Sequence, residues 1–196
     1  LADRFCDEAL EQELFKITFA SDHWRKMDAG ELTREQAYAE MLHRAKQAGF
    51  FFEVQGILDD WTSMLRTKSN VVSIIKSLKR KNYQVFYLSN ISRDVLNIIE
   101  QRDFWPLFDG GVASCELMVN KPSPLIYETL LERYNLNREE TIFTDDNPIN
   151  VKAAYDLGIT AIQFQGADNL VKSLTAYGID LSRRKVTNKD KHKHSS

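Results

Sequence analysis

The chain has 196 residues, of which 43% are hydrophobic and 28% are charged, as in a globular protein with one domain of ordinary size and at most a small insert. No apolar stretch is long enough to span a bilayer, and the first ten residues lack the basic and apolar regions of a signal peptide. The two cysteines have neither the spacing nor the density of a disulfide scaffold. We therefore expect a cytoplasmic protein with no membrane partner.

The formal net charge of -2 is unevenly distributed along the chain. Residues 182–196 carry six Lys or Arg and one acidic residue, a net +5, which leaves -7 for residues 1–181. Because this basic tail holds a single aliphatic residue, Val186, we expect it to be disordered. It has no aromatic residue to stack on bases and the rest of the chain is acidic, so we expect no nucleic-acid partner. Nothing in the sequence indicates the oligomeric state.

Residues 1–68 have the apolar pattern of helices. Apolar side chains recur every three to four positions in 5–17 and again in 53–66, which predicts a helix in each. Between them, Thr33 and Gln36 have the spacing of a capping box at the start of another helix. The run GFFFEV fits either a short strand or a helix start. We predict a helical unit over residues 1–68.

Residues 69–181 alternate between short apolar runs and helical patterns. The predicted strands are 83–88, a weaker one around 112–113, 141–144 and 159–164, and a helix follows each of them. Such alternation is typical of a parallel α/β sheet with helices on both faces. The sequence therefore predicts a helical unit over 1–68, an α/β unit over 69–181 and the basic tail over 182–196.

Polar side chains follow the predicted strands at the edge where open α/β sheets bind ligands. Ser89 and Asn90 follow the first strand, and a hydroxyl beside the free N–H groups of a helix start suits a phosphate, although either residue also suits a simple helix cap. Lys121 precedes Pro122, which favours an extended backbone that directs the lysine toward this edge. The alternative for Lys121 is an ordinary surface lysine.

Two adjacent acids, Asp145 and Asp146, follow the third predicted strand. Neighbouring side chains of an extended chain point in opposite directions, so the two carboxylates need not share a ligand. One can bind Mg2+, which prefers oxygen ligands, and the other can pair with a lysine. A helix cap would explain one of these acids but not both. Together, the anion cradle, the lysine and the acids predict a site for phosphoryl chemistry.

Three sequence blocks resemble one known family. LSN (88–90), NKPSPLIY (120–127) and IFTDDNPINVKAAYDLGI (142–159) follow one another as in the haloacid dehalogenase superfamily. The likeness is greatest to its sugar-phosphatase-like members and to the phosphatase domain of soluble epoxide hydrolase, and it covers about Val71 to Gly178. The resemblance implies a Rossmann-like sheet, with residues 1–68 forming a helical cap, a region that MDAGELTREQ fits loosely.

The resemblance also implies roles for the residues at the strand ends. Ser89 and Asn90 would hold a phosphoryl group, and Lys121 would bridge that group and the carboxylates. Asp146 would bind Mg2+, while Asp145 would support the lysine or a metal-bound water. Asn150 would shape the loop. The substrate expected for such a site is a small phosphorylated metabolite.

In capped members of this family, specificity lies largely in the cap. The candidates here are Trp24, which can stack on a ring, and Arg25, which can meet an anionic group. The alternative is that the tryptophan packs inside the cap and the arginine is solvated. The sequence does not identify the substrate.

The family's reaction also needs a strand that ends in D-x-D, whose first aspartate is the nucleophile. The 196 residues contain no such motif. In the family this strand is central, so its absence predicts unpaired inner edges on the strands ending at LSN and TDD. One hypothesis is therefore a Mg2+-dependent phosphatase seen as an N-terminally truncated chain. The alternative is a non-catalytic relative that binds a phosphorylated ligand or a protein partner. Other reactions of the superfamily, such as dehalogenation, fit the retained acids less well.

Overall fold

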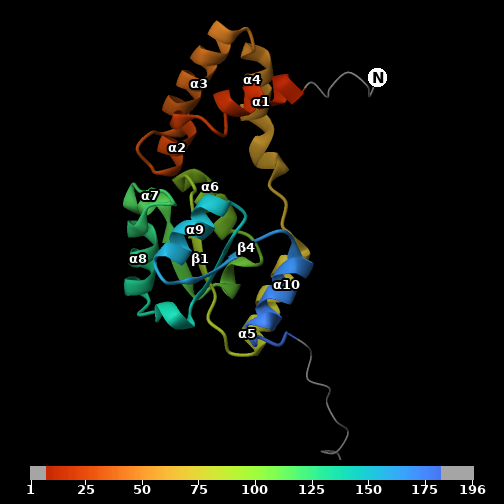
Figure 1. Ribbon diagram of the computed structural model, residues 1–196. Coiled ribbons are helices and arrows are strands. Elements are labelled where there is room, and N and C mark those ends of the chain that lie inside the picture. The colour runs from red at the N-terminus through yellow and green to blue at the C-terminus, as the bar shows by residue number, and fades with distance from the viewer. Residues whose placement is uncertain (1–7, 182–196) are drawn as a thin grey trace, which may run out of the picture.

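The structure, a computed structural model, describes residues 8–181 (Figure 1). The predicted disordered tail at 182–196 lies outside the described residues. The first part of the chain is helical, as predicted, and the second part alternates strands with helices. Within 8–181, no helix is both long enough and apolar enough to cross a membrane.

Within the predicted helical unit, residues 8–64 form helices that share one hydrophobic core. Its elements are α1 (Glu8–Ile17), α2 (Asp22–Asp28), α3 (Arg34–Ala48), α4 (Phe51–Asp60) and the 3-10 helix η1 (Trp61–Met64). The predicted capping box is confirmed, because Thr33 accepts a hydrogen bond from the Gln36 backbone and the Gln36 side chain accepts one from the Thr33 backbone. The ambiguous GFFFEV run leads into α4 instead of forming a strand. The core is built around Met27, Ala37, Met41 and Val54.

The remaining described residues form four short parallel strands and the helices around them. Their order is α5 (Ser69–Arg80), β1 (Phe86–Ser89), α6 (Arg93–Glu100), η2 (Trp105–Leu107), β2 (Gly110–Ala113), α7 (Ser114–Leu117), α8 (Pro124–Arg133), η3 (Arg138–Glu140), β3 (Ile142–Asp145), α9 (Pro148–Asp156), β4 (Thr160–Gln163) and α10 (Ala167–Ala176). All four predicted strands are present. The first begins and ends later than its apolar run suggested, because its pairing with β2 starts only at Phe86.

The strands form two separate pairs instead of one sheet. β1 lies parallel to β2, with Leu88 opposite Val112, and β3 lies parallel to β4, with Thr144 opposite Ile162. Among residues 8–181, no strand joins β1 to β3. The predicted absence of the central strand is therefore confirmed for this part of the chain.

The two strands of the first pair differ in burial. Val112 and Ala113 of β2 are 0% exposed, whereas all four residues of β1 are only half-buried. In parallel sheets covered on both faces the inner strands are normally the most buried. Here β1 is less buried than β2, although each has a single partner strand among residues 8–181. Val112 of β2 lies inside the hydrophobic cluster formed with α8, whereas Phe86 and Leu88 of β1 are only partly buried against that cluster.

Helices, not backbone pairing, hold the two strand pairs together. One hydrophobic cluster joins α8 and α9 to Leu88 of β1, Val112 of β2 and Phe143 of β3. A second cluster on α5 and α10 includes Ile142 of β3 and Ile162 of β4. Helices therefore cover both faces, as expected for a Rossmann-like α/β fold.

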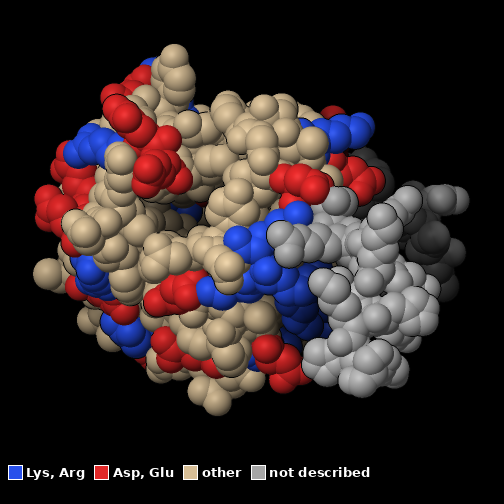
Figure 2. Space-filling view, turned by 90° about the horizontal axis from the view of Figure 1, so that it is seen from below, with Lys and Arg blue, Asp and Glu red and all other residues tan. Residues whose placement is uncertain are grey.

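Basic side chains gather on part of the face seen from below (Figure 2). The last turn of α5 carries Lys79 and Arg80, and Lys81 follows. Lys79 is paired with Asp109 at 2.5 Å and Lys81 with Asp180 at 3.5 Å. Part of the positive charge at this end of α5 is thus balanced by neighbouring acids.

Candidate functional site

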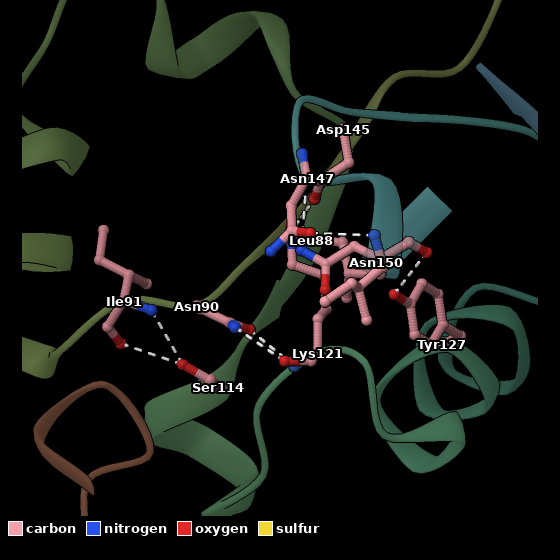
Figure 3. Close-up of polar contacts among 10 residues, drawn as sticks. Leu88, Asn90, Ile91, Ser114, Lys121, Tyr127, Asp145, Asn147 and Asn150 are labelled. Atoms are coloured by element: carbon pink, nitrogen blue, oxygen red, sulfur yellow. Dashed lines mark hydrogen bonds and ion pairs between the residues drawn. The ribbon is translucent and has the colours of Figure 1, made fainter. Parts of the chain in front are cut away.

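Lys121 lies where the carboxyl ends of the two strand pairs meet (Figure 3). Its ammonium nitrogen is 2.7 Å from Asp145 Oδ2 at the end of β3 and 2.7 Å from the Leu88 carbonyl oxygen on β1. Both charged side chains are only 8% exposed. Because buried charges are costly unless they are paired and hydrogen-bonded, this arrangement is a built ion pair and not a chance surface contact. The alternative interpretation, that Lys121 is an ordinary surface lysine, is therefore wrong.

Asp145 uses both of its carboxylate oxygens within the protein. Oδ2 accepts from Lys121, while Oδ1 accepts from the Asn147 backbone N–H at 2.8 Å and from Asn150 Nδ2 at 3.2 Å. Asn150 is buried, and its carbonyl accepts a hydrogen bond from the Tyr127 hydroxyl. Asp145 is therefore placed to orient the lysine and to order the start of α9.

The Tyr127 hydroxyl lies close enough to the ion pair for the charge of Asp145 to affect its pKa. Burial raises the pKa of its hydroxyl, and the negative charge of Asp145 raises it further. The hydroxyl therefore stays protonated and continues to donate to the Asn150 carbonyl. This hydrogen bond joins α8 to the first turn of α9, which directly follows the two acids.

Asp146 is placed differently from its neighbour. Its side chain is exposed, and its backbone carbonyl accepts a hydrogen bond from Gln163 Nε2 at 3.3 Å. The predicted divergence of two adjacent acids is thus observed, with one buried against a lysine and one in solvent. Among residues 8–181, no group of three or more His, Cys, Asp or Glu side chains is arranged to hold a metal ion. Of the two acids, Asp146 has the accessibility a Mg2+ ligand needs, and the role stays a prediction.

Asn90 holds the lysine loop against the loop after β1. Its Nδ2 donates to the Lys121 carbonyl at 3.0 Å, and its Oδ1 accepts from the Lys121 N–H at 2.8 Å. Ser89, the last residue of β1, precedes it and is half-buried. The structure therefore brings Ser89, Asn90, Lys121 and Asp145 together, while the predicted substrate contacts of Ser89 and Asn90 stay predictions.

The two predicted specificity residues lie in α2. The Trp24 ring is 8% exposed and packs edge-on against Phe19 and Trp61, with centroids 4.6 Å and 4.8 Å away. Arg25 is exposed and forms an ion pair with Asp22 at 2.5 Å. These positions agree with the alternative of a packing tryptophan and a solvated arginine.

Three residues at the contact between the helical unit and the strands were not singled out from the sequence. They are Asp28, Ser114 and Asn120. Ser114 Oγ donates to the Asp28 carbonyl at 2.5 Å, and Asn120 Nδ2 donates to the Arg25 carbonyl at 2.7 Å. Nothing in the neighbouring sequence distinguishes these three residues from other polar residues. The hydrogen bonds that connect the two parts of the chain join residues more than 80 positions apart.

The Asp28 carboxyl is unusual among the acids of this region. Burial raises its pKa to about 7, and the negative charge of Asp94 adds to the rise. Hydrogen bonds involving the Trp24 side chain and the Ser92 backbone oppose it only in part. An acidic residue in the last turn of a helix is normally expected to be exposed to solvent. No local pattern in the sequence therefore predicts that Asp28 has a raised pKa.

The fold and this site define a Rossmann-like α/β protein with a buried lysine–carboxylate pair at the carboxyl edge of its strands. The family model of the haloacid dehalogenase-like hydrolases matches residues 2–158, well over half of the chain. The chain belongs to this family. The resemblance stated from the sequence is therefore confirmed.

Individual proteins agree with this assignment. The chain is 28% identical over 143 residues to the sesquiterpene phosphatase astK of Aspergillus oryzae, covering 72% of each protein. Two other relatives are longer, and the matched region spans only 30% and 55% of them.

Solved structures share the fold. A HAD-like family hydrolase from Porphyromonas gingivalis superposes with a TM-score of 0.65 at 23% identity, covering 89% of this chain and 91% of that one. A HAD-family enzyme of Bacteroides thetaiotaomicron, solved with magnesium and inorganic phosphate, gives 0.58 at 23% identity, covering 83% and 86%.

Proposed function

We propose that this chain carries the phosphoryl-binding and metal-binding half of a Mg2+-dependent phosphomonoester hydrolase. The observation that carries the proposal is the buried Lys121–Asp145 pair, which also contacts the Leu88 carbonyl at the end of β1. A pre-organised cation at this edge stabilises the charge that develops on a transferring phosphoryl group. The phosphatase among the relatives and the magnesium and phosphate complex of a neighbour support the same chemistry.

Each residue of the site has a distinct proposed role. The Ser89 hydroxyl and the Asn90 backbone N–H bind the phosphoryl oxygens, close to the start of α6, which favours an anion. Lys121 pairs with these oxygens, and Asp145 holds the lysine in place. Asp146, exposed beside them, would bind Mg2+, which supplies further positive charge near the phosphoryl group. The proposed substrate is a small phosphorylated metabolite.

Turnover through an aspartyl-phosphate needs a carboxylate nucleophile close to Lys121. The sequence has no D-x-D motif, and within 8–181 the inner edges of β1 and β3 have no partner strand. A strand between β1 and β3 would bring such a carboxylate to the lysine and would pair both edges. Catalysis in this proposal depends on a segment of that kind.

The same observation favours a second candidate. A protein with Ser89, Lys121 and Asp146 but no nucleophile would bind a phosphorylated ligand or a protein partner without turning it over. The binding groups do not depend on the D-x-D strand for their mutual hydrogen bonds, because Asn90 and Asp145 already position Lys121.

One experiment separates the two candidates. The purified chain is assayed for phosphate release from a panel of phosphomonoesters with and without Mg2+, and its binding of inorganic phosphate is measured by calorimetry. Asp146→Asn tests the metal ligand, and Asp103→Asn, an exposed acid away from the strand ends, is the matched control.

Mg2+-dependent release that is lost in Asp146→Asn and kept in Asp103→Asn supports the hydrolase. Because the 196 residues contain no D-x-D strand, both candidates predict Mg2+-dependent phosphate binding with no release by the chain alone. A second form of the chain, extended by an apolar strand that ends in D-x-D, separates them: release by this form supports the hydrolase, and binding with no release supports the non-catalytic binder. If the wild-type chain neither binds nor releases phosphate, both candidates are wrong.

A further inference from the structure

The last residue of α2 is joined to the loop that follows β1 through a side chain of α7. The contact runs through Ser114, which is 0% exposed and begins α7. Its hydroxyl donates to the Asp28 carbonyl at 2.5 Å and accepts from the Ile91 N–H at 2.8 Å. Figure 3 shows Ser114 beside Ile91, in the loop that also carries Asn90. One buried hydroxyl thus joins the helical unit to the proposed phosphoryl-binding loop.

The Ser114 hydroxyl has two competing acceptors for a single proton. Besides the Asp28 carbonyl, the Ile91 carbonyl lies 3.4 Å from Oγ. Because a hydroxyl donates one hydrogen bond at a time, the proton is directed to the helical unit while that unit is seated. Without the Asp28 carbonyl, the proton would be free to turn toward the Ile91 carbonyl, and this rotation would also reorient the lone pairs of Oγ that receive the Ile91 N–H.

Further contacts seat the same turn. The Asp28 carboxyl interacts with the Ser92 backbone, one residue after Ile91. Arg34 at the start of α3 forms an ion pair with Asp94 on α6, and Asp94 also accepts from the Ser92 hydroxyl at 2.6 Å. The helical unit therefore contacts the loop at both Ile91, through Ser114, and Ser92.

Gly30 shows how closely the turn is seated. Its φ of +76° is in the region that favours glycine, and a Cβ added there would lie 3.1 Å from the Cys115 carbonyl oxygen on α7. A side chain at this position would act as a wedge between the turn and α7. Gly49 offers a matched comparison, because its φ is +84° and nothing lies within 4 Å of an added Cβ.

We propose that Ser114 is a positioning residue that couples the seating of the helical unit on α7 to the geometry of the Ser89–Ile91 loop. The proposal rests on the proposed function, because that loop is where the phosphoryl group would bind. Seating of the helical unit then completes the binding loop, and withdrawal loosens it. The coupling is local, and it needs no change in the strands.

The test measures hydrogen exchange at the Ile91 amide by NMR in the full chain, alone and with inorganic phosphate and Mg2+. Ser114→Ala removes the acceptor of this N–H, and the exchange rate should rise about tenfold. Thr18→Val is the matched control, because it removes another fully buried hydroxyl, one that donates to the Leu14 carbonyl within the helical unit and not to the Ile91 loop. It should change Ile91 exchange by less than about twofold.

The decisive variant does not touch Ile91 or Ser114. Gly30→Ala should raise Ile91 exchange several-fold, whereas Gly49→Ala, which carries the same backbone strain in the same helical unit, should leave it unchanged. If Gly30→Ala does not fold, Asn120→Ala replaces it, because it removes a different contact to α2, the hydrogen bond to the Arg25 carbonyl. It too should raise the exchange rate.

The outcomes separate this proposal from the proposed function. A rise in Ser114→Ala with no change in Gly30→Ala or Asn120→Ala would mean that Ser114 only braces the loop, and the coupling would be overturned. Absence of phosphate binding by the wild-type chain would count against the proposed function, while the exchange rates would still decide the coupling. If phosphate binds, its Kd should weaken in Ser114→Ala and Gly30→Ala but not in Gly49→Ala.

Discussion

The Asp28 carboxyl makes the stability of this protein depend on pH in a direction opposite to that of most acids. Its pKa is raised from 3.8 to about 7 by burial, so between these values the folded state holds a proton that the unfolded state has released. The group therefore contributes stability that is fully present below about pH 4 and is lost as the pH rises through about 7. Asp28→Asn removes this titration and keeps a neutral polar side chain of the same shape.

The magnitude follows from the size of the shift. One pKa unit corresponds to about 1.4 kcal/mol, so a rise of roughly three units sets an upper bound of about 4 kcal/mol. Between about pH 5 and about pH 8 only about two of these units are lost, which lowers the bound to about 2.7 kcal/mol. Because Asp28 is only half-buried, solvent screening reduces this further, and we expect a loss of about 1–2 kcal/mol. Other groups that titrate in this range are common to wild type and variant, so they cancel in the difference between the two.

The assay is urea unfolding at about pH 5 and about pH 8, followed by circular dichroism. The free energy of unfolding of the wild type should fall relative to that of Asp28→Asn as the pH rises. Asp22→Asn on the same helix is the control, because hydrogen bonds from Arg25 and Lys26 lower the pKa of Asp22 to about 2 and it does not titrate in this range. Parallel pH profiles for wild type and Asp28→Asn would refute the reasoning.

Three further predictions follow from single contacts. Lys121→Met should lower the free energy of unfolding by about 3–5 kcal/mol, because it leaves the Asp145 carboxylate buried without its cation, and a smaller loss in Lys121→Met combined with Asp145→Asn would confirm the pairing by urea unfolding. Asp146→Asn should change the free energy of unfolding by less than about 0.5 kcal/mol while abolishing Mg2+-dependent phosphate binding in calorimetry. A loss of stability as large as that of Lys121→Met would contradict the exposed position of Asp146. Thr33→Ala should cost about 1 kcal/mol through loss of the capping box, and an unchanged melting temperature would count against that cap.

Several features could be predicted because they depend on neighbours in the chain. The Thr33–Gln36 capping box needs only a spacing of three residues, and it is present as expected. The strands of residues 69–181 are short apolar runs bounded by helices, and all four were found within a few residues of their predicted places. Among residues 8–181 no strand lies between β1 and β3, which agrees with the lack of any apolar run ending in D-x-D in the 196 residues.

The candidate site was predicted in part for the same reason. Parallel strands bring their carboxyl ends to one edge, so Ser89, Lys121 and Asp145 were expected to lie close together. The structure places Lys121 against both the Asp145 carboxylate and the Leu88 carbonyl. The role of Asn90 was less accessible, because its two hydrogen bonds to the Lys121 backbone require a loop geometry that no local pattern specifies.

The amino-acid order of this protein is sufficient to establish its family, its alternation of strands and helices and the set of polar residues at the strand ends, because all of these depend on local spacing and on a topological rule. The three-dimensional packing assigns different environments to chemically identical residues. It buries Asp145 against Lys121 and leaves Asp146 in solvent, and it gives Asp28 a pKa near neutrality while Asp22, six residues earlier, stays strongly acidic. The physical reason is that burial and charge pairing depend on segments far away in the chain, and the sequence alone does not reveal which segments meet.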